Sequence, residues 1–299
     1  MSCMCITECI YFGKQASFLV DVHRLRRAIS SLQEHLAVPS PLTSIAIIVC
    51  LARLPPPRPV ASASINFFKI MSLKFYYDLL SQPSRALYIF LKKCNIPFEK
   101  KIVNLKDLEQ YTPEFEEINR FKKVPVIDHD GFKLAESVGI VRYLSREFKV
   151  DDHWYPSDSK KQAKVDEYLE WQHLNTRLHC ATYFLTKFLN PLMRGKPPKP
   201  EKVAEFESRM NDCIDLIENV WLKDTPFLIG NTISVADIFC ACELEQPRIA
   251  GYDPKKGRPR LTAWMERVMS ETSPHYQDAH KFLNQMAAQN PTQNFNFKL

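Results

Sequence analysis

The order of secondary-structure patterns in the middle of this 299-residue chain constrains its fold more than any other feature. Residues 73–77 are apolar and aromatic, which predicts a strand, and a proline stands at the head of the helical pattern that follows. A second strand is expected over 98–103, then a hairpin of two strands, 124–127 and 132–134, and then a helix from 137. This β-α-β and then β-β-α order predicts a small α/β layer structure.

Strand patterns end after Pro156, and only helical spacing follows. A long helical pattern runs toward Asn190, where Pro191 is expected to stop it, and a Lys/Pro linker follows. Four apolar stripes at helical spacing come next, over 203–221, 235–242, 261–268 and 279–286. We therefore expect an α/β domain over 71–152 and a larger all-helical domain over 153–299.

The first 70 residues differ in kind from the rest of the chain, because prolines cluster and serine is frequent there. One amphipathic stretch, 18–36, is their only helical pattern, and it has arginines but few acids. We expect residues 1–70 to be an N-terminal extension, disordered or artefactual, ahead of a true start at Met71. Mitochondrial targeting by this extension is the alternative.

Composition excludes several classes of function. Of the net charge of +6, the first 70 residues carry +4, and the lysine pairs of the rest are scattered, so no concentrated basic face for nucleic acid is expected. No apolar run approaches the roughly 20 residues that a membrane span needs. The nine cysteines form no CxxC pair and no zinc-ligand spacing. We expect no metal site and a reducing, cytoplasmic location.

Ser81 stands at the turn from the first strand to the first helix. A helix N-terminus has unpaired N–H groups and a partial positive charge, so it favours an anion. A hydroxyl at that point can donate a hydrogen bond to a thiolate. The alternative, which the local sequence alone favours, is that Ser81 or Ser84 caps the helix.

Two further motifs belong with this turn. Val124-Pro125 is a candidate cis peptide that would present the Val124 backbone to an extended peptide, although an ordinary trans proline is favoured from these residues alone. Glu136 and Ser137 open the next helix, where they suit an ammonium and a carboxylate group, although each is singly more typical of a cap. Together the three motifs outline a site for a short, zwitterionic, thiol-bearing peptide.

These motifs carry a family resemblance. Segments 79–86 (LLSQPSRA), 122–125 (KKVP), 135–137 (AES) and 165–173 (VDEYLEWQH) resemble those of the cytosolic glutathione S-transferases, closely the theta class, and the likeness spans 71 to about 288. The resemblance implies a thioredoxin-like N-terminal domain that binds glutathione as co-substrate, with no tightly bound cofactor. It also implies an α-helical domain that binds small hydrophobic electrophiles, a homodimer, and a conjugating, detoxifying activity.

The resemblance also implies roles for individual residues. Ser81 would be the thiol-activating hydroxyl. Lys123 and the Val124 backbone would hold the glycyl carboxylate and the cysteinyl portion of glutathione. Glu136 and Ser137 would hold its γ-glutamyl end.

Other positions extend or depart from the family pattern. Arg177 matches a position that lines the mouth of the active site. Gln110 replaces a histidine that binds the glycyl carboxylate, so this glutathione contact is expected to be weaker. Ser234 and Asp237 resemble the family's capping box, which is structural. The chain ends soon after Phe297, which predicts a more open electrophile site than in relatives with a longer tail.

The chemistry requires only a modest stabilisation of the thiolate. A free thiol has a pKa of about 8.5, and lowering it by about two units takes roughly 2.7 kcal/mol. One hydroxyl donor contributes about 1.5–3 kcal/mol and the helix N-terminus up to about 1 kcal/mol. No general base is needed, because bulk solvent can take the proton.

There are three alternatives to this hypothesis. Tyr76 or Tyr77 could supply the hydroxyl in place of Ser81, as tyrosine does in other classes of the family. A thiol-disulfide oxidoreductase is disfavoured, because serines occupy the places where its cysteines would stand. A non-catalytic ligand carrier or complex subunit with the same fold is the rival from another functional class.

The electrophile pocket itself is weakly specified. Its candidate lining residues are Leu174, Leu178, Phe184 and the loop 246–251, and for all of them plain core packing is favoured.

Overall fold

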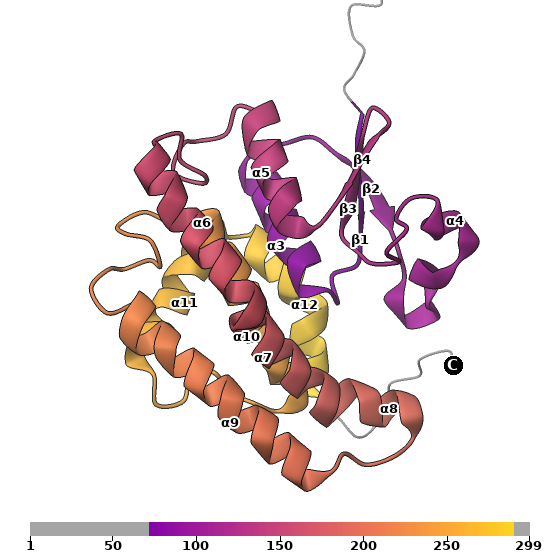
Figure 1. Ribbon diagram of the computed structural model, residues 1–299, viewed down its shortest axis with the longest axis vertical. Coiled ribbons are helices and arrows are strands. Elements are labelled where there is room, and N and C mark those ends of the chain that lie inside the picture. The colour runs from indigo at the N-terminus through magenta and orange to yellow at the C-terminus, as the bar shows by residue number, and fades with distance from the viewer. Residues whose placement is uncertain (1–71, 290–299) are drawn as a thin grey trace, which may run out of the picture. The chain divides into compact units, whose positions relative to one another are not determined.

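A computed structural model describes residues 72–289 of the chain, which belong to one compact unit (Figure 1). The expectations for residues 1–70 and for the last ten residues lie outside this described part. Within residues 72–289, no helix combines the length and apolar character that crossing a bilayer requires.

Four short strands form one mixed sheet with the order β2-β1-β3-β4. They are β1 (Leu73–Tyr77), β2 (Glu99–Ile102), β3 (Val126–His129) and β4 (Phe132–Ala135). Strand β1 pairs parallel with β2 and antiparallel with β3, and β3 pairs antiparallel with β4. The predicted strands are confirmed, and the hairpin is tighter than expected. Its turn is Asp130-Gly131, both with positive φ, which matches the right-handed twist of the strands.

Helix α3 (Gln82–Lys93) lies between the sheet layer and the helical half of the unit. Each of its first ten residues is buried, because it contacts α5 (Ser137–Glu147) of its own layer and also α10 (Val235–Glu245) and α12 (His275–Ala288). Between β2 and β3 the chain forms only short elements: η2 (Leu105–Asp107), η3 (Glu109–Tyr111) and α4 (Pro113–Glu116).

After α5 the described residues contain no further strand, as predicted. The helical elements are α6 (Ser159–Leu174), α7 (Thr176–Phe184), the π-helical η4 (Leu185–Leu189), α8 (Asn190–Arg194), α9 (Pro200–Leu216), the π-helical η5 (Ile217–Trp221), α10, η6 (Gln246–Ala250), α11 (Pro259–Thr272) and α12. The prediction that Pro191 stops a helix is wrong. Pro191 lies in the first turn of α8, directly after the π-helical η4, and the chain stays helical to Arg194 before Gly195 at φ +61°.

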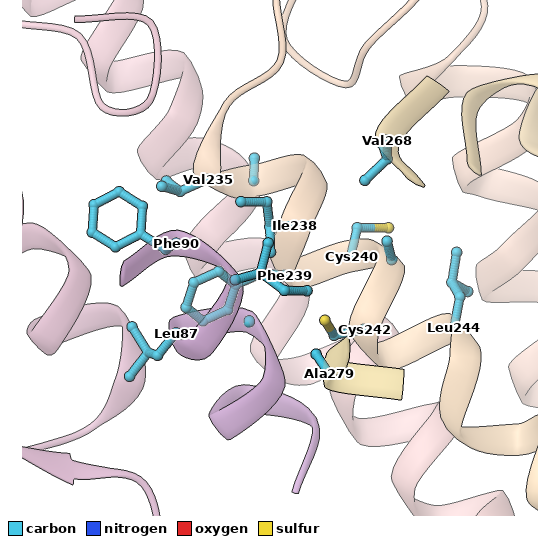
Figure 2. Packing of buried hydrophobic residues seen from close by; sticks show 14 of the residues in the cluster. Leu87, Phe90, Val235, Ile238, Phe239, Cys240, Cys242, Leu244, Val268 and Ala279 are labelled. Atoms are coloured by element: carbon cyan, nitrogen blue, oxygen red, sulfur yellow. The ribbon is translucent and has the colours of Figure 1, made fainter. Parts of the chain in front are cut away.

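Helix α10 is the centre of the core, and all of its residues are buried. Figure 2 shows Val235, Ile238 and Phe239 of α10 near Leu87 and Phe90 of α3. Besides its apolar residues, α10 carries three buried carboxylates, Asp237, Glu243 and Glu245, and each accepts a hydrogen bond from a side chain on another helix.

The predicted capping box at the start of α10 is confirmed. The buried Asp237 carboxylate accepts hydrogen bonds from the backbone N–H of Ser234 (2.9 Å), the backbone N–H of Leu228 (2.9 Å) and Nε1–H of Trp264 (2.8 Å). Burial raises the pKa of Asp237, although these donors oppose the rise. This carboxylate fixes the entry to α10.

Candidate functional site

The sheet register brings the three predicted motifs to one edge. Tyr76 near the end of β1 pairs with Val126 at the start of β3, and Val126 pairs with Ala135 at the end of β4. The turn after β1, the segment before β3 and the segment after β4 therefore leave the sheet on the same side. Residues that are about 55 positions apart in the sequence are thus neighbours at this edge.

Ser81 occupies the N-cap position of α3, but its hydroxyl makes no capping hydrogen bond. The local preference for a cap is therefore wrong, and one physical reason is Pro83 at the second helical position, which has no N–H to donate. The hydroxyl of Ser84 does not act as a cap either, since it is buried without a hydrogen-bond partner in the described part of the chain. The backbone of Ser81 is held, with its N–H donating to Asp78 O and its carbonyl accepting from Arg85 N–H, both at 3.0 Å.

Ser81 lines a cavity of about 350 Å³ between the sheet edge and the helices. Its polar lining comprises Ser81, Gln82, Gln110, Arg177 and Gln246. The helices contribute an apolar wall of Ala181, Phe184, Leu185, Phe188, Leu189, Met193 and Met286. Leu80, Leu105, Leu108 and Tyr111 complete the sheet side. A cavity with a few polar groups in an apolar wall is typical of a small-molecule site.

Gln110 and Arg177 thus share the cavity with Ser81. Gln110 lies in η3, and its buried Oε1 has no hydrogen-bond partner within residues 72–289. Arg177 projects from α7, and its Nη1 donates to Oε1 of the buried Glu243 on α10 at 2.5 Å. The second carboxylate oxygen of Glu243 is buried without a partner in the same described part. Arg177 is 38% exposed, so its charge is only partly withdrawn from the solvent.

Lys123 and Val124 do not line the cavity but lie in the segment before β3. Val124-Pro125 is cis, so the preference for a trans proline is wrong, because the general frequency of cis bonds says nothing of this particular turn. Val124 packs against the small apolar cluster beside β3, and the carbonyl of Lys123 accepts from Asn119 Nδ2 at 2.7 Å. The Lys123 side chain is exposed.

Glu136 and Ser137 also lie outside the cavity lining, at the head of α5. Glu136 is the N-cap residue with φ +67° and ψ 108°, a conformation that a side-chain-bearing residue rarely adopts. Its side chain is exposed and makes no capping hydrogen bond, so the preference for a cap is wrong here too. The first N–H groups of α5, from Ser137 onward, therefore receive no hydrogen bond from the Glu136 side chain.

The tyrosine rivals of Ser81 lie elsewhere. Tyr77 is buried in the sheet layer and stacks on Phe75 with ring centroids 4.5 Å apart, and burial raises its pKa to about 12. Tyr76 contacts Phe115 and lines a separate hollow beside β2. Neither tyrosine lines the cavity that contains Ser81.

The sequence specified the apolar wall poorly. Phe184 and Gln246 line the cavity, whereas Leu174 and Leu178 are 73% and 45% exposed, so they are neither core nor lining. The remaining wall residues were missed. Their signal was the i, i+4 pairing of Phe184 with Phe188 and of Leu185 with Leu189. Among residues 72–289, no group of three His, Cys, Asp or Glu side chains is arranged to hold a metal ion.

Two protein-family models match the chain. The model described as "Glutathione S-transferase, N-terminal domain" matches residues 71–146, and the model described as "Glutathione S-transferase, C-terminal domain" matches residues 178–272. Among curated proteins, glutathione S-transferase theta-3 of Mus musculus is 42% identical over 212 residues, which are 71% of this chain and 88% of the relative.

Solved structures agree with these matches. Human glutathione S-transferase T1-1 in its apo form has a TM-score of 0.70 at 39% identity, covering 74% of this chain and 93% of that one. Human glutathione transferase theta-2, in complex with glutathione and an unknown ligand, has a TM-score of 0.71 at 37% identity, covering 75% and 93%.

Proposed function

We propose, since the chain belongs to the theta class of the glutathione S-transferases, that Ser81 is its thiol-activating residue. The protein has the family's architecture, a thioredoxin-like layer followed by a helical half. Its activity is the conjugation of glutathione to small hydrophobic electrophiles, which is a detoxifying reaction.

The uncommitted hydroxyl of Ser81 is the single observation that carries the proposal. It stands at the head of the 12-residue helix α3, makes no capping hydrogen bond and lines the cavity. A glutathione sulfur at this point would accept a hydrogen bond from the Ser81 hydroxyl and feel the partial positive charge of the helix N-terminus. Both interactions are stronger for the thiolate than for the thiol, so they lower the pKa of the bound thiol.

We assign the rest of glutathione to the same edge of the sheet. The γ-glutamyl carboxylate would be bound by the Ser137 hydroxyl and the first N–H groups of α5, and its ammonium by Glu136. The cysteinyl backbone would pair with the Val124 backbone. The glycyl carboxylate would meet Lys123 and Gln110. The sheet register supports this assignment, because it gathers these segments beside the Ser81 turn.

The electrophile would lie against the apolar wall of the cavity. A volume of about 350 Å³ suits a small molecule, and the Phe184 and Phe188 rings offer it apolar contact. Arg177 would lie at the polar end of this site. Because Arg177 is paired with Glu243, we expect it to orient a polar substituent of the electrophile without strongly favouring an anion.

Assembly, domain limits and compartment are further parts of the proposal. We propose a homodimer, supported by exposed large apolar side chains such as Phe121, Phe132 and Leu174, which sedimentation velocity would test. We propose domain limits of 71–152 and 153–299, which follow the end of the sheet layer. A cytoplasmic location is supported by the five described cysteines, all of which are free thiols.

The test of the catalytic assignment compares Ser81→Ala with Tyr76→Phe. Loss of a hydrogen bond to an anion is worth about 1.5–3 kcal/mol, so Ser81→Ala is expected to lower kcat/KM by roughly 10- to 150-fold. Tyr76→Phe is expected to leave it within about twofold. The reverse pattern would move the catalytic hydroxyl to Tyr76. Retention on immobilised glutathione without turnover of any alkyl halide, epoxide or aralkyl electrophile would instead favour a ligand carrier.

A further inference from the structure

One carboxylate joins the two segments that form the sheet side of the cavity. Oδ1 of Asp78 accepts a hydrogen bond from the backbone N–H of Leu80 at 2.8 Å. Its Oδ2 accepts from the backbone N–H of Leu105 at 2.9 Å. Leu80 precedes Ser81, and Leu105 begins the segment that contains Gln110. Asp78 therefore ties the Ser81 turn to the neighbouring segment of the same sheet-side wall.

A guanidinium holds the same turn from the other side. Arg85 is fully buried, and its Nη1 donates to the carbonyl oxygens of Leu79 at 2.9 Å and Leu80 at 3.2 Å. Its Nη2 donates to the carbonyl oxygen of Cys242 at 3.0 Å and to Oε1 of Gln246 at 2.8 Å. Arg85 therefore fastens the turn to the end of α10.

Together these two side chains bond the turn's backbone on both sides. The N–H of Leu80 donates a hydrogen bond to Asp78, and the carbonyls of Leu79 and Leu80 accept hydrogen bonds from Arg85. Among residues 72–289, the Arg85 guanidinium has no carboxylate within bonding distance. Burying such a cation is costly, and an apolar side chain would fill the space at lower cost. A buried guanidinium at this point is explained if the turn must be held in a single conformation.

We infer that Asp78 and Arg85 are positioning residues that fix the Ser81 hydroxyl toward the sulfur of glutathione. The inference rests on the proposed role of Ser81. Neither residue needs to touch glutathione. Each acts through the backbone of the turn, whose displacement by about 1 Å would cost on the order of 10²-fold in rate.

The variant Asp78→Asn separates positioning from charge. Asparagine keeps one acceptor oxygen, but its NH₂ group cannot accept, so either Leu80 or Leu105 loses its partner. If Asp78 acted only as a negative charge near the sulfur, its removal would favour the thiolate and lower the pKa of the bound thiol. If Asp78 positions Ser81, its removal raises that pKa. The two roles therefore predict shifts of opposite sign.

The experiment measures the ultraviolet thiolate absorbance of enzyme-bound glutathione against pH, with kcat and KM, in the full chain. We expect Asp78→Asn to raise the pKa of the bound thiol and to lower kcat about 10- to 100-fold. Asp152→Asn is the matched control, since Asp152 also accepts from a backbone N–H but lies outside the cavity. It is expected to change neither quantity.

A double variant tests whether Asp78 acts through Ser81. We expect Ser81→Ala with Asp78→Asn to have the same bound-thiol pKa as Ser81→Ala alone, because the effects of coupled residues do not add. An Asp78→Asn enzyme with an unchanged or lowered thiol pKa would overturn the inference while leaving the role of Ser81 intact. No change with Ser81→Ala would instead overturn the proposed function.

Arg85→Lys tests the turn from its second side. Lysine keeps the charge but not the planar fork, so we expect a higher bound-thiol pKa and a lower kcat with this variant as well. If one of the two variants lost the native near-ultraviolet circular dichroism, the other would decide the matter. A drop in melting temperature with an unchanged thiol pKa would mean that the residue is structural only.

Discussion

The two walls of the cavity are built by different forces. On the sheet side, the Ser81 turn is held by directional hydrogen bonds, which it donates to Asp78 and accepts from Arg85. On the helical side, Phe184 and Phe188 stack with ring centroids 5.6 Å apart. Hydrogen bonds fix atoms to within tenths of an ångström, whereas apolar contact tolerates changes of shape. The proposed roles of Ser81 and of the electrophile site would thus place the chemistry on the rigid wall and leave the adaptable wall to the variable substrate.

The largest effect is expected from a variant that tests whether directional hydrogen bonds stabilise only the sheet side of the molecule. Asp237→Ala leaves the N–H groups of Ser234, Leu228 and Trp264 buried without a partner. At about 1–3 kcal/mol for each unsatisfied group, the free energy of unfolding should fall by at least about 3 kcal/mol. Urea denaturation measures it, with the exposed Asp224→Ala as control. A loss below about 1 kcal/mol would show that apolar packing alone holds α10.

The next effect probes the adaptable wall itself. Phe188→Ala removes a side chain that is 5% exposed and should cost about 3 kcal/mol of stability, the low end for a buried phenylalanine, because Phe188 already lines a cavity. We expect kcat/KM for a small alkyl halide to change by no more than about threefold, and turnover of a bulky aralkyl electrophile to improve, since the variant enlarges the cavity. Steady-state kinetics with both substrates measures this. Equal, large losses of kcat/KM with both substrates would mean that activity requires one fixed geometry of the helical wall as well.

A smaller effect is expected from the buried side chain of His280 on α12, which lies near Arg85. Burial, helped by the nearby Arg85, lowers the pKa of His280 to about 3, although Glu245 opposes this shift. Between pH 6.5 and 3 the unfolded chain takes up a proton that the folded one refuses, so stability is retained above pH 6.5 and lost as pH falls. His280→Gln should remove up to about 2 kcal/mol of this loss at pH 5. Urea denaturation at pH 7 and at pH 5 measures the difference, and an identical pH dependence in both proteins would contradict it.

The smallest effect concerns Gln110, whose buried amide oxygen has no hydrogen-bond partner among residues 72–289. Gln110→His restores the side chain that the family resemblance leads us to expect at this position. We predict a KM for glutathione about two- to fivefold lower with kcat unchanged, since one hydrogen bond to a carboxylate is gained without altering the Ser81 turn. Gln277→His, at an exposed position of α12, is the control. A change in kcat alone would place Gln110 in the chemical step.

The sequence predicted the element order because local patterns set it. The strand 73–77 and the helix from Gln82 follow from apolar spacing and one proline, and both are confirmed. The caps were mispredicted, because whether Ser81 or Glu136 bonds its own helix depends on φ, ψ and the neighbouring N–H groups. The apolar wall needs the fold itself, because Met286 joins Phe184 only once α12 packs beside α3.

The bonds of Arg85 have a consequence for how the molecule comes apart. One guanidinium is hydrogen-bonded to the turn after β1 and to the end of α10, so neither partner can leave without stranding a buried cation. The sheet layer and the helical bundle should therefore melt in a single cooperative transition. Heat should abolish the thiol chemistry at the same temperature at which the helices are lost.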